Sequence, residues 1–88
     1  MTYKPSEAIR QLLEEAKKQP TKTAGHEVAA RTAAKITWMH EYLLVIEDAI
    51  KRSDLTTFAD AKRERVFAKD ELAALSELLR QAEEWIAR

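Results

Sequence analysis

Apolar residues recur at alternating spacings of four and three positions along two long stretches of this chain. The later stretch contains Ala61, Arg65, Ala68, Leu72, Leu75, Leu79, Ala82 and Ile86. The earlier one contains Thr32, Ile36, Met39, Leu43, Ile46 and Ile50. We call each of these stripes a seam, because the heptad spacing is typical of a helix that packs along a neighbouring helix. Only the polar stretch 51–54 separates the two seams, which predicts a long antiparallel helical hairpin.

A shorter helix is predicted before the hairpin. Pro5 suits the first turn of a helix, and Ile9, Leu12, Leu13 and Ala16 then form one apolar stripe. Pro20 disfavours helical geometry in the residue before it, so this helix should end near residue 19. The sequence therefore predicts a single all-α domain, 1–88, with helices at about 5–19, 24–52 and 54–87. The expected N-caps are Thr21 or Thr23 for the second helix and Ser53 or Asp54 for the third.

Each arm of the hairpin has a second apolar stripe beside its seam. On the second helix this stripe is Trp38, Tyr42, Val45 and Ala49, and on the third it is Phe67, Ala74, Leu78 and Trp85. Both stripes are rotated from their seams in the same sense, so we expect them on one side of the hairpin. The first helix, roughly 20 Å long, can cover only about half of each arm of some 40 Å. It should meet Ala74, Leu78 and Trp85.

Five apolar residues toward the hairpin turn are then left uncovered: Trp38, Tyr42, Val45, Ala49 and Phe67. We call these five residues the open flank. An exposed apolar patch usually marks a binding surface, and Trp and Tyr are common interface anchors. Aromatic stripes at helical spacing are also common in cores. Here such a core would be a homodimer in which two hairpins form a four-helix bundle. A site for a different protein is the alternative, and one surface can serve both.

Composition narrows the classes of function. The 15 basic and 15 acidic residues cancel, which argues against a dedicated nucleic-acid binder. A basic excess in the N-terminal third leaves a small DNA-associated regulator, using Lys17 to Lys35, as the alternative hypothesis. The chain has no cysteine and no apolar run of the ~18 residues that would span a membrane. Residues 1–7 lack the apolar stretch of a secretory signal, so we expect none. We therefore expect a cytoplasmic protein without a membrane partner.

The chain offers few residues for catalysis or metal binding. His26 and His40 are the only histidines, and no Glu-x-x-His motif occurs. We expect both to be surface residues, and Arg65, the one charge within the third helix's seam, to pair with Glu47 across the hairpin. No nucleophile–base pair or phosphate loop can be assembled, so we expect no enzyme activity, cofactor or metal. The sequence favours a non-catalytic protein–protein interaction module, such as an adaptor, an inhibitor or a chaperone-like protein.

Overall fold

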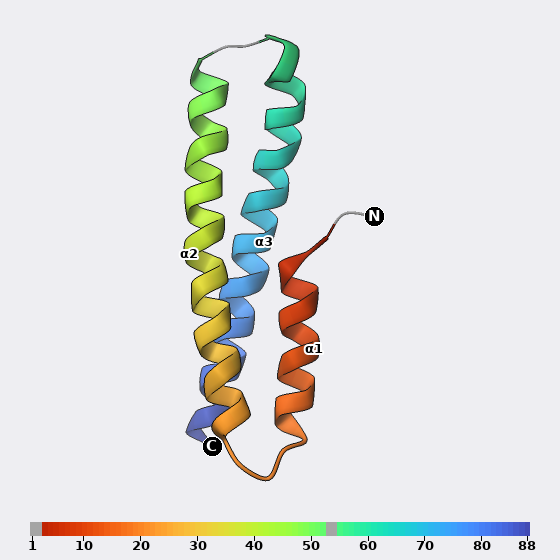
Figure 1. Cartoon of the computed structure of the whole chain (residues 1–88), viewed down its shortest axis with the longest axis vertical. Helices are drawn as coiled ribbons and strands as arrows, with labels where there is room; N and C mark the ends of the chain where they lie inside the picture. The colour runs from red at the N-terminus through yellow and green to blue at the C-terminus, as the bar shows by residue number, and fades with distance from the viewer. Residues whose placement is uncertain (1–2, 53–54) are drawn as a thin grey trace.

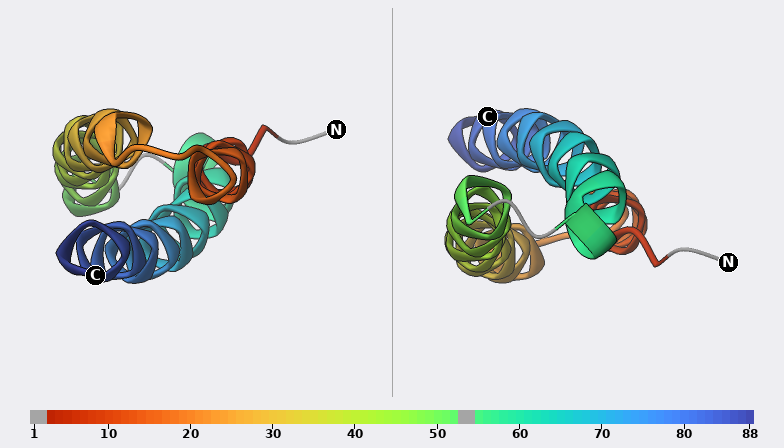
Figure 2. Two further views of the ribbon diagram at one scale, coloured as in Figure 1. Left: turned by 90° about the horizontal axis from the view of Figure 1, so that it is seen from below. Right: turned by 90° about the horizontal axis from the view of Figure 1, so that it is seen from above.

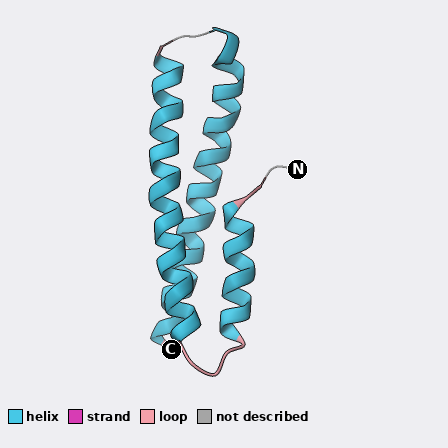
Figure 3. Ribbon diagram, in the orientation of Figure 1, coloured by secondary structure: helices cyan, strands magenta, loops and turns pink. Residues whose placement is uncertain are grey.

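The computed structural model of the chain contains three helices joined by short loops, with no strand among the residues that it describes (Figure 3). It describes residues 3–52 and 55–88, with the side chains of the third helix from residue 60 onward. The helices are α1, Pro5–Lys17; α2, Thr23–Lys51; and α3, Leu55–Ala87. They form a rod of 53 × 23 × 14 Å. The predicted all-α hairpin with a shorter N-terminal helix is confirmed (Figure 1).

The ends of the helices differ slightly from the predicted ones. α1 already ends at Lys17, and its last turn is closed by the N–H groups of Lys18 and Gln19, which donate to the carbonyls of Glu15 and Ala16, each at 3.1 Å. The predicted threonine caps of α2 are wrong. The N-cap of α2 is Lys22, whose side chain makes no capping hydrogen bond, and Thr23 is already helical. The predicted N-caps of α3, Ser53 and Asp54, lie outside the described residues.

The two arms of the hairpin pack along the predicted seams. Met39 of α2 and Ala68, Leu75 and Ala82 of α3 are each 1% exposed or less. Thr32, also in the α2 seam, is fully buried, and its hydroxyl donates a 2.6 Å hydrogen bond to the carbonyl of Val28. This bond satisfies the hydroxyl inside its own helix, so a polar residue is accommodated in an apolar seam.

The buried residues form two clusters along the rod. At the end that contains the C-terminus all three helices contribute to a larger cluster: Ile9, Leu13, Ala16, Val28, Leu75, Leu78 and Ala82. Toward the α2–α3 turn, α2 and α3 alone enclose a smaller cluster: Met39, Ile46 and Ala68. Figures 1 and 2 show the reason, since α1 lies beside both arms for only part of their length. The half of the hairpin near the turn is therefore two helices thick.

A buried carboxylate fixes the start of α1. Glu71 of α3 is 5% exposed and Ser6 of α1 is 3% exposed. The backbone N–H and the hydroxyl of Ser6 donate to the two carboxylate oxygens of Glu71, at 3.0 and 2.6 Å. The N-cap residue, Lys4, supplies no capping hydrogen bond of its own. Glu71 therefore caps α1 from another helix, and its negative charge lies at the positive end of the α1 dipole.

The single glycine of the chain allows a close contact between α2 and the C-terminal end of α3. A Cβ atom on Gly25 would lie 3.0 Å from Cδ1 and 3.4 Å from Nε1 of Trp85. The same indole also contacts a cation, because Nζ of Lys22 is 3.4 Å from the ring centroid and donates to the Trp85 carbonyl at 2.9 Å. Nε1 of Trp85 is buried and has no acceptor among the described residues. Packing and the cation–π contact hold this ring.

Substituting Gly25 tests this contact. We expect Gly25→Leu to displace the Trp85 indole and lower the thermal midpoint, even though leucine has the higher helix propensity. Ala30→Leu, at an exposed position on the same helix, should leave the midpoint nearly unchanged. Tryptophan fluorescence in a Trp38→Phe background reports Trp85 alone. An unshifted Trp85 emission in Gly25→Leu would contradict the contact.

Candidate protein-binding groove

A groove opens beside the first residue of α1, where the hairpin arms continue beyond that helix. It has a volume of about 260 Å³ and is lined by Tyr3, Pro5, Lys35, Trp38, Met39 and Phe67. Met39 is buried, whereas Trp38 is 53% and Tyr3 66% exposed. The groove therefore brings together Trp38 and Phe67 of the open flank, one from each arm. Residues just before and at the start of α1 form its border.

The rest of the open flank continues along α2 toward the turn. The rings of Trp38 and Tyr42 are stacked, with centroids 5.4 Å apart and an angle of 4° between their planes. Val45 follows one turn later and is 67% exposed, and Ala49 is half-buried. The α2 side of the flank is thus a continuous apolar strip with a rigid aromatic pair at one end.

The α3 side of the flank is polar apart from Phe67. Phe67 is half-buried, and the residues that precede it on the same helical face are Asp60, Arg63 and Glu64. Arg63 forms an ion pair with Asp60 along the helix. Glu64 reaches across the hairpin and accepts a 2.7 Å hydrogen bond from the Tyr42 hydroxyl. Helical spacing does not predict this acceptor, although a Tyr beside a helix seam needs an acceptor wherever its ring is partly buried.

The Tyr42 hydroxyl should titrate abnormally. Its hydrogen bond to Glu64, together with desolvation and the negative charge of Glu64, raises the pKa of Tyr42 above 10.0. The contribution of the protonated phenol to stability is therefore fully present below about pH 10 and is lost as the pH rises through the folded-state pKa. We expect Glu64→Ala to bring this pKa back toward 10.0. Phenolate absorbance in a Tyr3→Phe background measures Tyr42 alone, and an identical titration with and without Glu64 would contradict the assignment.

Arg65 does not form the predicted pair. It is half-buried in the seam, and among the described residues it makes no ion pair with Glu47. The Tyr42–Glu64 hydrogen bond gives the reason, because it places Arg65 near the level of residue 41. Glu47 then lies about six residues, or roughly 9 Å, further along α2. The seam spacing alone did not give the register between the arms.

The remaining candidates for chemistry are separate surface residues. His26 and His40 are both exposed. Across residues 3–52 and 55–88, no three His, Asp or Glu side chains are grouped so that they could hold a metal ion. No described helix is long and apolar enough to cross a lipid bilayer.

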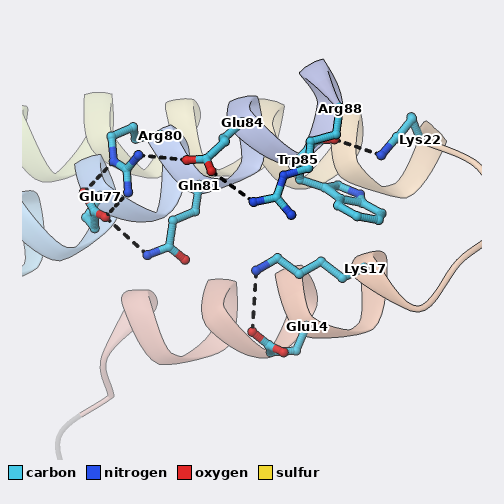
Figure 4. A network of polar contacts seen from close by, with 9 residues as sticks. All are labelled: Glu14, Lys17, Lys22, Glu77, Arg80, Gln81, Glu84, Trp85 and Arg88. Atoms are coloured by element: carbon cyan, nitrogen blue, oxygen red, sulfur yellow. Dashed lines mark hydrogen bonds and ion pairs between the residues drawn. The ribbon is translucent and has the colours of Figure 1, made fainter.

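Basic side chains near the C-terminus surround a second hollow, of about 170 Å³, but acids accompany them (Figure 4). Arg80 pairs with Glu77 at 2.6 Å and with Glu84 at 2.9 Å, and Arg88 also pairs with Glu84 at 3.0 Å. Hydrogen bonds from Arg80 and Gln81 lower the pKa of Glu77 to about 2, and the two carboxylates raise that of Arg80. The cations that line this hollow are thus matched by carboxylates at neutral pH, so the hollow does not offer the excess positive charge that an anion site needs.

Comparison of the chain with known proteins identifies no relative. No protein-family model, no curated protein and no solved structure matches this chain. The site must therefore be interpreted from its own geometry and chemistry.

Proposed function

We propose that this chain is a non-catalytic protein–protein interaction module that binds through its open flank. The observation that carries the proposal is the stacked pair of Trp38 and Tyr42, followed by Val45, on a part of the hairpin that α1 does not cover. Stacked aromatic rings offer a large apolar area at a small cost in side-chain entropy. The neighbouring groove, with buried Met39 at its base, can receive an apolar side chain of a partner.

The charge arrangement supports a protein partner over DNA. In the Lys17 to Lys35 region, Lys17 is 3.9 Å from Glu14, and the ammonium of Lys22 lies against Trp85. These lysines do not form an acid-free basic face, which phosphate binding usually requires. An apolar flank with a polar border resembles the anatomy of protein interfaces. Adaptor, inhibitor and chaperone-like roles all use such a surface.

The experiment compares two matched charge insertions on α2. Trp38→Glu places a carboxylate in the open flank, and Leu44→Glu places one at a 65% exposed position on another face of the helix. We expect cross-linking in an extract of the native host to give a protein adduct that wild type and Leu44→Glu share and Trp38→Glu lacks. Circular dichroism should show that all three remain helical. Equal adducts from all three proteins, or salt-sensitive binding to arbitrary duplex DNA in place of an adduct, would reject the proposal.

A further inference from the structure

We propose that the open flank is occupied by a second copy of this chain, docked antiparallel about a two-fold axis that crosses the hairpin near residues 43–44 and 62–63. This inference rests on the proposed function, because it names the partner of the same surface. In this arrangement α2 packs on α2 of the second copy and α3 packs on α3. Together the four helices close a bundle over the half of the hairpin that α1 does not cover.

The surface area of the chain supports a missing neighbour. Its accessible surface is 6197 Å², whereas a compact monomer of 10.1 kDa should expose about 5,300 Å². The excess, roughly 900 Å², is close to the ~800 Å² that each partner buries in an interface of standard size. The radius of gyration is likewise 15.6 Å, against about 12 Å for a compact chain of this length. The chain exposes about one interface more than a self-contained domain would.

The position of the axis follows from the register of the hairpin. The apolar strip of α2 extends from Trp38 to Ala49, so its centre lies between residues 43 and 44. The Tyr42–Glu64 hydrogen bond places residue 64 of α3 at the level of residue 42, so the centre of the strip lies beside residues 62–63 of α3. An axis through this level therefore crosses the α2 strip at its centre.

Rotation about this axis pairs large side chains with small ones on α2. Residues at equal distances on either side of the centre meet, so Trp38 faces Ala49 of the second copy and Tyr42 faces Val45 of the second copy. Each exposed aromatic ring thus covers a smaller apolar side chain, and both contacts occur twice. This is the self-complementarity that an isologous interface requires.

A parallel pairing would place α2 against α3 and would lose the contacts between Trp38 and Ala49 and between Tyr42 and Val45. A flank evolved only for an unrelated helix would have no reason to be complementary to itself about its own centre. The self-complementarity of the α2 strip therefore favours a second copy as the occupant.

The oligomeric state provides the first test. We expect wild type to sediment as a dimer at micromolar concentration, with a melting temperature that rises with concentration. Val45→Glu should raise the dissociation constant at least about tenfold, because its carboxylate would face the Tyr42 ring and Glu64 of the second copy. Leu44→Glu, at a similarly exposed position away from the flank, should remain a dimer. A wild-type monomer at all these concentrations would overturn this inference. The proposed function would still stand if Trp38→Glu abolished a cross-link to another protein.

A pair of complementary charges on α2 tests the axis itself. Trp38→Lys and Ala49→Glu should each weaken the dimer, since each places a charge against an apolar side chain of the second copy. Mixed in equal amounts, the two variants should form a heterodimer in which Lys and Glu meet at one contact and Ala49 meets Trp38 at the other. Sedimentation of the mixture, with one variant carrying a mass tag, measures this pairing. Dimers of undiminished affinity from each variant alone, or a mixture that stays monomeric, would overturn the antiparallel axis.

Discussion

Replacing Leu75 with alanine should lower the free energy of unfolding by about 2–5 kcal/mol, a large share of the stability of so small a domain. Leu75 is 0% exposed and belongs to the cluster that joins all three helices, together with Leu13 and Val28. Its truncation would leave a cavity that three rigid helices cannot easily fill. Since a domain of this size loses about 4–8 °C per kcal/mol, the thermal midpoint should fall by about 8 °C or more.

The control is Leu44→Ala, the same chemical change at a residue that is 65% exposed. It should alter the free energy of unfolding by no more than about 0.5 kcal/mol in urea denaturation. If Leu75→Ala melted within a few degrees of wild type, the packing of the three helices around this residue would be refuted.

Removing the Glu71 carboxylate should cost about 1–3 kcal/mol, because it leaves the N–H and the hydroxyl of Ser6 buried without their acceptor. The loss of stability should fall mainly on α1, because its N-cap residue, Lys4, makes no side-chain capping hydrogen bond. Urea denaturation of Glu71→Ala gives the total cost. Amide hydrogen exchange at Ser6 and its neighbours shows whether α1 opens first.

A double-mutant cycle with Ser6→Ala separates this contact from general effects. If the carboxylate acts through Ser6, the two substitutions together should cost less than the sum of the single ones. Glu83→Ala, which removes an exposed acid from the same helix, should change little. Full additivity of Glu71→Ala and Ser6→Ala would mean that the contact contributes no stability.

The helices and the packing faces were predictable because they follow from spacing alone. The seams have four–three periodicity, and the buried positions Met39, Ile46, Ala68, Leu75 and Ala82 all belong to them. The reach of α1 was also predictable to within a turn, since a short helix between two prolines has a known rise per residue. The end of α1 at Lys17 depends on contacts that spacing does not reveal.

The long-range polar contacts were not predictable in the same way. Glu71 was overlooked because an acid on a long helix is usually solvated, yet it occupies the gap between Phe67 and Ala74 in the second stripe of α3. That position was the available signal, because a charge within an apolar stripe needs a partner. The partner, Ser6, depends on where α1 docks, and the acceptor of Tyr42 depends on the register of the hairpin. A periodic pattern specifies neither the docking position of α1 nor the register of the hairpin.

The free energy of local opening should differ between the two ends of the rod. It should be lower near the α2–α3 turn, where the rod is two helices thick, than at the other end, where it is three helices thick. Separating the arms near the turn exposes only the small cluster around Met39 and Ile46, whereas separating them at the other end also dislodges α1. Partial unfolding should therefore begin near the turn at a free energy well below the global one. A molecule bound across both arms near the turn would raise this local free energy before it raised the global one. Amide exchange near the turn would then become slower, while the melting temperature changed little.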